Sequence, residues 1–205
     1  MKKFPDTIPV FPLSGVIFFP KTNLPLNIFE QRYLNLVNDA YENDKLMGMV
    51  QSKKDDNSVY DIGCMGKISD YQKSKDGRVL INLTGISRFK ILKEIKNEKP
   101  YREFQVDYKN FIEDGNNAHS EINAESLMEK TKTFFKRNGL LLNWREFEKL
   151  DNAQKINTLA MIAPITNEEK QKLLESISLE NKIKTLESII SFYLYETGLN
   201  NQTIQ

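Results

Sequence analysis

The segment 8–33 constrains the fold more than any other part of the chain. It reads IPVFPLSGVIFFPKTNLPLNIFEQRY and combines dense apolar residues with interspersed prolines. Proline has no backbone N–H to donate to a β ladder, so it is found at sheet edges, strand starts and bulges. The sequence therefore predicts strand segments around Pro9 and Pro12, and again around Pro25, that begin or border a sheet.

An amphipathic helix is predicted directly after this segment, over residues 32–43. Tyr33, Leu36, Val37 and Ala40 recur at the i, i+3, i+4, i+7 spacing of one helix face. Glu30 stands at the start of this helix, where a carboxylate suits the positive end of the helix dipole.

The following residues, up to position 108, are typical of a β-rich lobe. Asp76-Gly77 predicts a hairpin turn. Gly63 and Gly66 mark bulges or close approaches of two backbones, and Gly85 predicts a turn. Short apolar or alternating runs predict strands at residues 46–50, 61–71, 79–84, 89–95 and 102–108.

The composition changes at residues 113–120, EDGNNAHS, which lack a periodic apolar pattern and predict a linker. Helical spacing dominates residues 121–197, with Thr166-x-x-Glu169 as a capping box, and residues 198–205 are expected to be a tail. We therefore expect an α+β protein with a β-rich lobe over residues 1–112, including one helix, followed by a helical bundle.

Three motifs carry a family resemblance. The order FPL, G, FP and LPLNIFEQRY within residues 8–33 resembles the opening of the Lon substrate-binding domain, the N-terminal domain of ATP-dependent Lon proteases. Gly63–Ile68 is similar to a glycine-bracketed strand of that family, and Gly85–Leu92 to its G-x-x-R-F-x-I-L strand pair. The resemblance covers residues 8–195. It implies a PUA-like pseudo-barrel and a domain that holds exposed apolar segments of unfolded or tagged proteins.

The composition indicates which partners and which cellular compartment to expect. The formal net charge is +1 over 205 residues, so no global field recruits nucleic acid. A single cysteine, Cys64, excludes an intramolecular disulfide and suits a reducing compartment. No uninterrupted apolar run approaches the length of a bilayer span. We expect a cytoplasmic protein with no membrane partner.

The residues offer little for catalysis. The only histidine, His119, lies in the predicted linker, where it is poorly placed for a catalytic triad. Gly66-Lys67 is followed by Ile68, so no P-loop is present. Lon's ATPase and protease domains follow its substrate-binding domain. The resemblance therefore implies a non-catalytic, stand-alone domain that acts as an adaptor in protein quality control, with a separate ATPase or protease as a working partner.

Metal ligands are equally sparse. One cysteine and one histidine, far apart in sequence, cannot form a structural zinc site. Asp55-Asp56-Asn57 is the densest carboxylate cluster, but it lacks the EF-hand pattern. We expect no metal and no cofactor.

The segment that carries the resemblance also supplies the candidate peptide-binding residues. In a strand, adjacent Phe18 and Phe19 point to opposite faces, which predicts one in the core and the other partly exposed. Glu30 and Arg32 are expected to add a polar rim, and unpaired edge backbone would suit strand addition. The candidates are Pro12, Phe18, Phe19, Pro20, Glu30 and Arg32. The competing interpretation is that these residues only build the core.

Two other functions remain open. PUA-like barrels bind RNA in other proteins, and Lys90, Lys93, Lys96 and Lys99 form a local basic run. Glu94 interrupts that run, which favours a solvated strand face over an RNA-binding surface. A scaffold for one folded partner is the other alternative to polypeptide binding.

Overall fold

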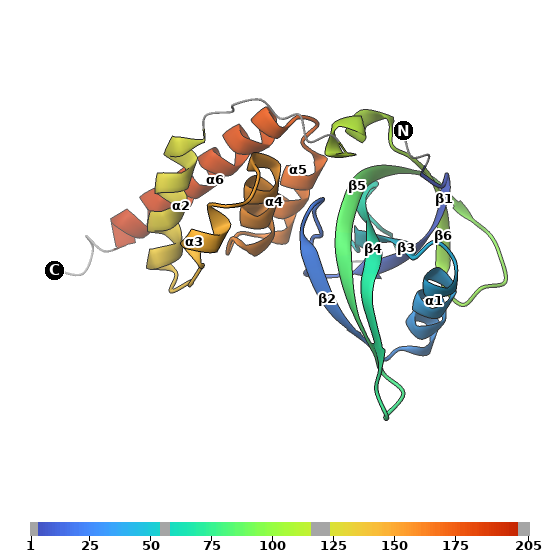
Figure 1. Cartoon of the computed structure of the whole chain (residues 1–205). Coiled ribbons are helices and arrows are strands. Elements are labelled where there is room, and N and C mark those ends of the chain that lie inside the picture. Colours follow the sequence, from blue (N-terminus) through green and yellow to red (C-terminus); the bar gives the residue numbers. More distant parts are fainter. Residues whose placement is uncertain (1–3, 54–57, 116–123, 201–205) are drawn as a thin grey trace. The chain divides into compact units, whose positions relative to one another are not determined.

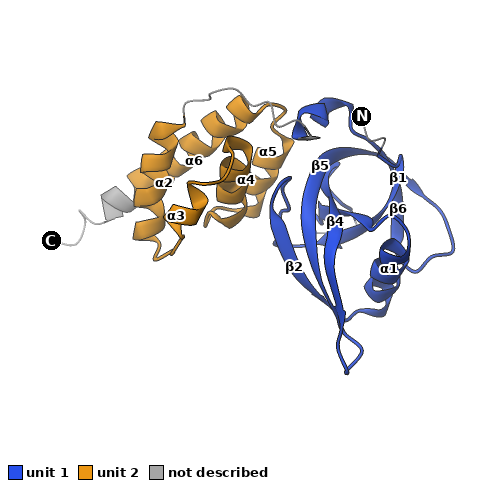
Figure 2. Cartoon of the chain, in the orientation of Figure 1, with its two compact units in different colours: residues 1–117 blue, residues 118–205 orange. Residues whose placement is uncertain are grey.

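The computed structural model describes residues 4–53, 58–115 and 124–200 (Figure 1). The chain forms two compact units, Met1–Asn117 and Ala118–Gln205 (Figure 2). His119 and the cluster Asp55-Asp56-Asn57 lie outside the described residues. The linker proposed for residues 113–120 extends beyond them too, and its limits stay a prediction.

Unit 1 is built on a six-stranded mixed sheet with the order β2-β5-β4-β3-β1-β6. β5 also pairs with β6, so the five strands other than β2 close into the ring visible in Figure 1, and β2 stands at the open end of the order. The α+β pseudo-barrel is thereby confirmed, as is the edge position predicted from Pro25. The strands are β1 (Thr7–Leu13), β2 (Asn23–Ile28), β3 (Leu46–Gln51), β4 (Ile62–Lys73), β5 (Val79–Ile95) and β6 (Arg102–Asp107).

β1 departs from the edge position that its prolines predicted. It lies between β3, its parallel partner, and β6, its antiparallel partner. Pro9 is paired with Glu103 of β6, whereas Pro12 is paired with Val50 of β3. The two ladders overlap only at Val10, so each proline stands where β1 is paired on one side. The missing N–H groups are accommodated locally, within a strand that is internal to the sheet.

The turn predicted at Gly85 is wrong, because this residue lies inside strand β5. The strand continues through Gly85 for 17 residues, from Val79 to Ile95. A Cβ atom at Gly85 would lie 2.2 Å from the backbone oxygen of Phe19. This glycine therefore allows a close approach of two backbones, the second role that glycine takes in strands.

The helix α1 (Gln31–Glu42) is confirmed, and it buries Tyr33, Leu36, Val37 and Ala40, the stripe predicted from spacing. Its turn region leads directly into β3. Inside the ring, the buried core is formed by Ile8, Val10, Val50, Met65, Phe89, Phe104 and Val106.

A buried ion pair fastens the end of unit 1 to the sheet. Asp114 lies in η1 (Lys109–Gly115), a 3-10 helix. Its carboxylate accepts hydrogen bonds from the backbone N–H of Arg88 at 2.8 Å and from Nη2 of Arg88 at 2.8 Å. The Arg88 and Asp114 side chains are 4% and 9% exposed. The arginine of the G-x-x-R-F motif thus holds the segment that ends the unit.

Unit 2 consists of helices in its described part. Thr166 and Glu169 form the predicted capping box, and the hydroxyl of Ser178 accepts the N–H of Asn181 at 3.1 Å. The last helix ends at Asn200, two residues past Gly198, where the sequence predicted its end. The helices are α2 (Glu125–Arg137), α3 (Trp144–Phe147), α4 (Asn152–Ile162), α5 (Asn167–Glu175) and α6 (Leu179–Asn200). Among the residues that the structure describes, none of these helices combines the length and the apolar content that a bilayer span requires.

Candidate functional site

The aromatic pair predicted to supply one exposed side chain is buried completely. Phe18 is 2% exposed and Phe19 is 0% exposed. Residues 16–19 do not form a strand, so the alternation on which the prediction rested does not apply. The backbone oxygen of Phe19 accepts the hydroxyl of Thr22 at 2.7 Å. Pro20 is buried too. These three residues build the core of unit 1, and in this structure none of them presents a surface to a client.

The other three candidates meet at one hollow, which we name the β1–α1 hollow. Pro12 comes from β1, and Glu30 and Arg32 from the start of α1. The hollow has a volume of about 460 Å³. Its further lining residues include Phe11, Tyr33, Ser52, Lys53, Tyr101 and Arg102.

Arginine side chains give the β1–α1 hollow a polar, cationic lining. Arg32 pairs with Glu30 at 3.0 Å, and its guanidinium lies 4.5 Å from the ring centre of Tyr33. Arg102 pairs with Glu94 at 2.7 Å. Burial raises the pKa of the Tyr33 phenol, an effect that nearby Arg32 partly opposes. The hollow can therefore offer hydrogen-bond donors beside aromatic surface.

Phe29, which directly precedes the lining residue Glu30, was not among the binding residues predicted from the sequence. It lies between the end of β2 and Glu30, and it is 66% exposed. The nearest signal was the alternation of β2, in which Leu24 and Ile28 are buried and the positions between them are partly or fully exposed. Phe29 itself lies one residue past the end of β2, so its exposure is a finding of the structure and not a consequence of this alternation. An exposed phenylalanine beside a polar hollow is suited to contact an apolar side chain of a partner.

Tyr101 lines the β1–α1 hollow, and its phenol makes the stability of the protein depend on pH in the alkaline range. Its hydroxyl donates to Asp39 of α1 at 2.6 Å. Burial, assisted by this hydrogen bond, raises the pKa of Tyr101 from 10.0 to about 12. An unfolded tyrosine ionises near pH 10, so Tyr101 contributes its full stability below pH 10. That contribution is lost as the pH rises through about 12.

We therefore expect the protein to lose stability between pH 10 and 12, and Tyr101→Phe to lose less over the same interval. Urea unfolding of both proteins at several pH values across this range measures the difference. Identical pH dependences of wild type and variant would contradict the assignment to Tyr101.

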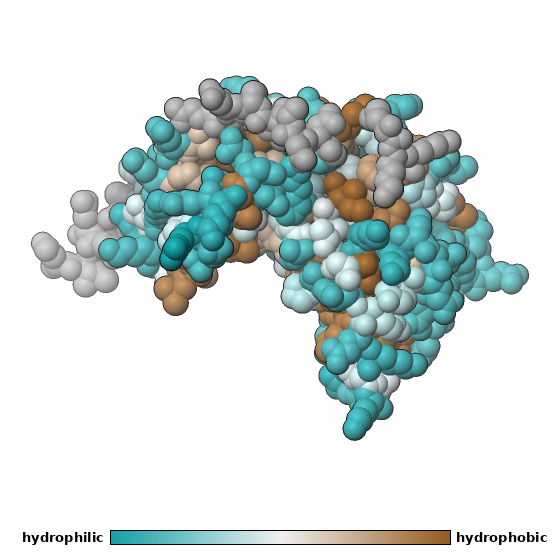
Figure 3. All heavy atoms as spheres, viewed as in Figure 1, coloured by the Kyte–Doolittle hydropathy of each residue, from teal (hydrophilic) through white to brown (hydrophobic). Residues whose placement is uncertain are grey.

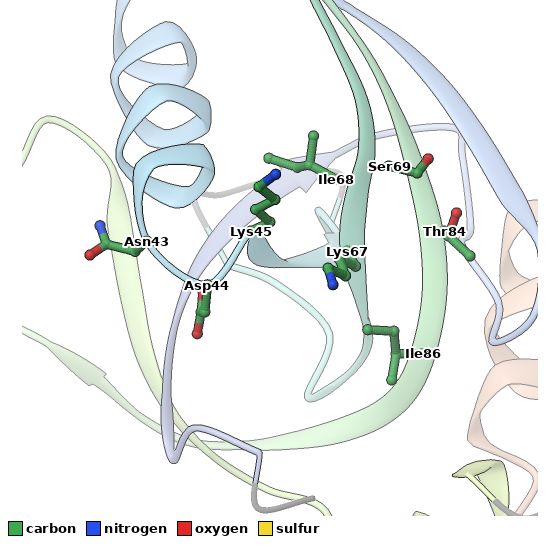
Figure 4. Close-up of a pocket in the computed structure, with 8 residues that line it drawn as sticks. All are labelled: Asn43, Asp44, Lys45, Lys67, Ile68, Ser69, Thr84 and Ile86. Carbon is green, nitrogen blue, oxygen red and sulfur yellow. The ribbon is translucent and has the colours of Figure 1, made fainter.

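A second hollow lies at the turn after α1 (Figure 4). It has a volume of about 680 Å³ and adjoins another of about 530 Å³, with Asp44, Lys67 and Ile86 lining both. Figure 4 shows Asn43, Asp44 and Lys45 on the turn, across from side chains of β4 and β5. Among residues 4–53, 58–115 and 124–200, no group of three His, Cys, Asp or Glu side chains is arranged to hold a metal ion.

Unit 1 exposes four large apolar side chains in its described part. On the face drawn in Figure 3, hydrophobic residues of this unit form small patches among hydrophilic ones. The large exposed ones in its described part are Phe29, Leu80, Leu92 and Ile112. Of these, Phe29 directly precedes the residues that line the β1–α1 hollow.

Comparison with known proteins decides the family. Residues 7–191 match the model of the ATP-dependent protease La (LON) substrate-binding domain. The chain belongs to the Lon substrate-binding domain family. A Lon protease of Syntrophus aciditrophicus is 27% identical over 208 residues, which cover 94% of this chain and 26% of that protein. A Lon protease of Dictyoglomus thermophilum is 25% identical, with 93% and 24% covered. The chain thus spans about a quarter of the length of these Lon proteases.

Solved structures of Lon domains share the fold. The Lon N-terminal domain protein from Xanthomonas campestris superposes with a TM-score of 0.69 at 20% identity, covering 89% of this chain and 97% of that one. The N-terminal domain of a Lon protease from the Mycobacterium avium complex gives a TM-score of 0.67 at 16% identity, covering 90% and 98%. These two likenesses show that the fold is shared.

Proposed function

We propose that this Lon substrate-binding domain binds exposed apolar segments of unfolded or tagged polypeptides, without catalysis of its own, at the surface formed by Phe29 and the β1–α1 hollow. Membership of the family supports polypeptide binding in general terms. The observation that carries the site is the 66% exposure of Phe29, directly before Glu30 and Arg32. As an adaptor, the domain would deliver its clients to a separate ATPase or protease.

The physical character of the site predicts weak binding. A flexible client loses conformational entropy when it is ordered, so a single exposed aromatic and a small hollow should give roughly micromolar affinity or weaker. The apolar contact falls to Phe29 and Pro12, while Glu30 and Arg32 form the rim. Such binding suits a domain that samples many clients.

Replacing Phe29 with serine should weaken client binding about tenfold while the melting temperature stays within a few degrees, because the side chain is mostly in solvent. Fluorescence anisotropy with labelled, reduced and carboxymethylated α-lactalbumin, a permanently unfolded chain, measures the affinity. Leu92→Ser is the matched control, since Leu92 is 55% exposed on β5 and its chain neighbours do not line the hollow, whereas Phe29 is followed by Glu30, which does. Equal losses in both variants would contradict the assignment to Phe29.

Reversing the charge of Glu30 or Arg32 tests whether the polar rim contributes to client binding. If Glu30→Lys and Arg32→Glu leave α-lactalbumin binding unchanged, the hollow takes no part in it. The same proteins can be titrated with single-stranded RNA, and tighter binding of RNA than of α-lactalbumin would favour the nucleic-acid function instead. Stable recovery of one folded partner without unfolded chains would favour a scaffold.

A further inference from the structure

We propose that the free edge of β2 binds an extended segment of a client by strand addition, through the outward backbone groups of Asn23, Pro25 and Asn27. This inference rests on the proposed function and specifies how the client chain is held. It also assigns a register, because the β2–β5 ladder determines which backbone groups of β2 point away from the sheet.

β2 is the strand that the ring leaves unpaired on one side. It pairs antiparallel with β5 from Asn23↔Thr84 to Ile28↔Val79. β5 pairs with β4 on its other side, and further along with β6, which closes the ring without β2. Asn23, Pro25 and Asn27 are exposed. An edge of this kind presents backbone donors and acceptors to another chain.

A bulge at the start of β2 sets the phase of the ladder. The N–H of Lys21 donates to the oxygen of Gly85 at 2.9 Å, and the N–H of Gly85 donates to the oxygen of Thr22 at 2.9 Å. Lys21 has a φ of 60°, the left-handed conformation found at the first position of such bulges. Gly85 therefore bonds to Lys21 and Thr22 together at a hydrogen-bonded position, from which the antiparallel ladder alternates.

The alternation assigns each remaining residue of β2. Leu24, Leu26 and Ile28 exchange hydrogen bonds with β5. Asn23, Pro25 and Asn27 consequently direct their backbone groups to the free edge. Proline at the central position agrees with this phase, because its missing N–H falls on the edge and costs the ladder nothing.

Pro25 removes one backbone donor from the free edge of β2, but the other backbone groups remain available for pairing. The edge retains the N–H groups of Asn23 and Asn27 and the carbonyl groups of all three residues. An added strand can therefore form hydrogen-bonded pairs opposite both asparagines and donate one bond to Pro25, whose own donor is absent. This incomplete ladder is consistent with weak, reversible binding.

The side chains of β2 predict the chemistry of the occupant. Leu24 and Ile28 are buried and Leu26 is half-buried on one face, whereas Asn23, Pro25 and Asn27 are exposed on the other. An added strand continues both faces, so it should carry apolar residues at alternate positions beside Leu26 and polar residues between them. The occupant is an extended chain of alternating character. Since β2 leads directly into Phe29, such a chain lies beside the proposed client site.

Restoring the missing donor provides a gain-of-function test. The probe is a fluorescein-labelled octapeptide of alternating valine and threonine with a lysine added at each end. Pro25→Ala should bind it about fivefold more tightly than the wild type, the worth of one added hydrogen bond. Pro164→Ala is the control, because Pro164 is an exposed proline outside any strand. Unchanged affinity of Pro25→Ala, or an equal gain in Pro164→Ala, would overturn the proposal.

Amide hydrogen exchange measured by NMR locates the bound strand. In the free wild-type protein, Leu24, Leu26 and Ile28 should be protected while Asn23 and Asn27 exchange quickly. The octapeptide should slow Asn23 and Asn27 selectively. Protection confined to other residues, or Pro25→Ala pairing with a second copy of itself in place of the peptide, would overturn strand addition by clients.

The two proposals can fail separately. If α-lactalbumin binds in a Phe29-dependent manner but the octapeptide protects neither asparagine, strand addition is wrong and the proposed function stands. If neither unfolded probe binds the wild-type protein, the proposed function itself is wrong.

Discussion

Replacing Phe19 with serine is expected to lower the free energy of unfolding of unit 1 by about 3–5 kcal/mol. The Phe19 side chain is 0% exposed, so the substitution opens a cavity and introduces a hydroxyl group into the core. Little relaxation is available, because the Phe19 carbonyl is held by Thr22 and stands against Gly85. Chemical denaturation of wild type and variant, followed by circular dichroism, measures the difference.

Phe29→Ser is the matched control for this experiment, since it makes the same chemical change at a side chain that is 66% exposed. It should alter the free energy of unfolding by about 0.5 kcal/mol or less. The pair separates the core and client-binding interpretations of the aromatic segment. If Phe19→Ser kept wild-type stability and lost client binding, Phe19 would be an exposed anchor and the buried position described above would be wrong.

Replacing Arg88 with alanine is expected to cost about 3–5 kcal/mol, the usual penalty for breaking a buried ion pair from one side. Asp114 would be left without its ion-pair partner in a site where its side chain is 9% exposed. The guanidinium of Arg88 also lies 4.4 Å from the ring centre of Phe111, so contact with η1 is lost as well. Thermal unfolding should show a melting temperature lower by roughly 10 °C.

An exposed arginine of the same unit provides the comparison. Arg78 pairs with Asp76 at 3.1 Å, and both side chains are more than half exposed. Arg78→Ala should therefore change the free energy of unfolding by less than about 1 kcal/mol. If Arg88→Ala were no more destabilising than Arg78→Ala, the buried pair would not be what holds η1 to the sheet.

Signals that act over a few residues were sufficient to predict much of the secondary structure. The spacing of Tyr33, Leu36, Val37 and Ala40 identified the buried face of α1. Thr166 caps α5, and Asp76-Gly77 turns between β4 and β5, with Gly77 at a φ of 87°. In each case the decisive contacts lie within one element or one turn, so neighbouring residues contain the information.

Gly85 and Phe18 show where local signals fail. A glycine serves equally for a turn or for a close approach of two backbones. At Gly85 the role is decided by the backbone of Phe19, which lies 66 positions earlier in the chain. Phe18 and Phe19 were expected to alternate, but the segment adopts no strand and both rings enter the core. Long-range packing decided both outcomes.

The candidate site was only partly accessible to sequence reasoning. Pro12, Glu30 and Arg32 were identified and do line one hollow, whereas Tyr101 and Arg102 of the same hollow were not. They come from the opposite end of unit 1 in sequence, and β1 brings them into place by pairing with β6. Nothing near Tyr101 in the sequence indicates that its hydroxyl reaches Asp39.

The sequence by itself determined the family, the α+β class and the edge position of β2. Motif order, apolar period and the missing N–H of Pro25 are properties of neighbouring residues. Only the tertiary structure decided which aromatic residue is exposed and which cations share a hollow. Burial is set by packing against residues far away in the sequence. The Phe18 ring stands against Gly66 and the Phe19 backbone against Gly85, whereas Phe29 lies in solvent although all three belong to one apolar segment.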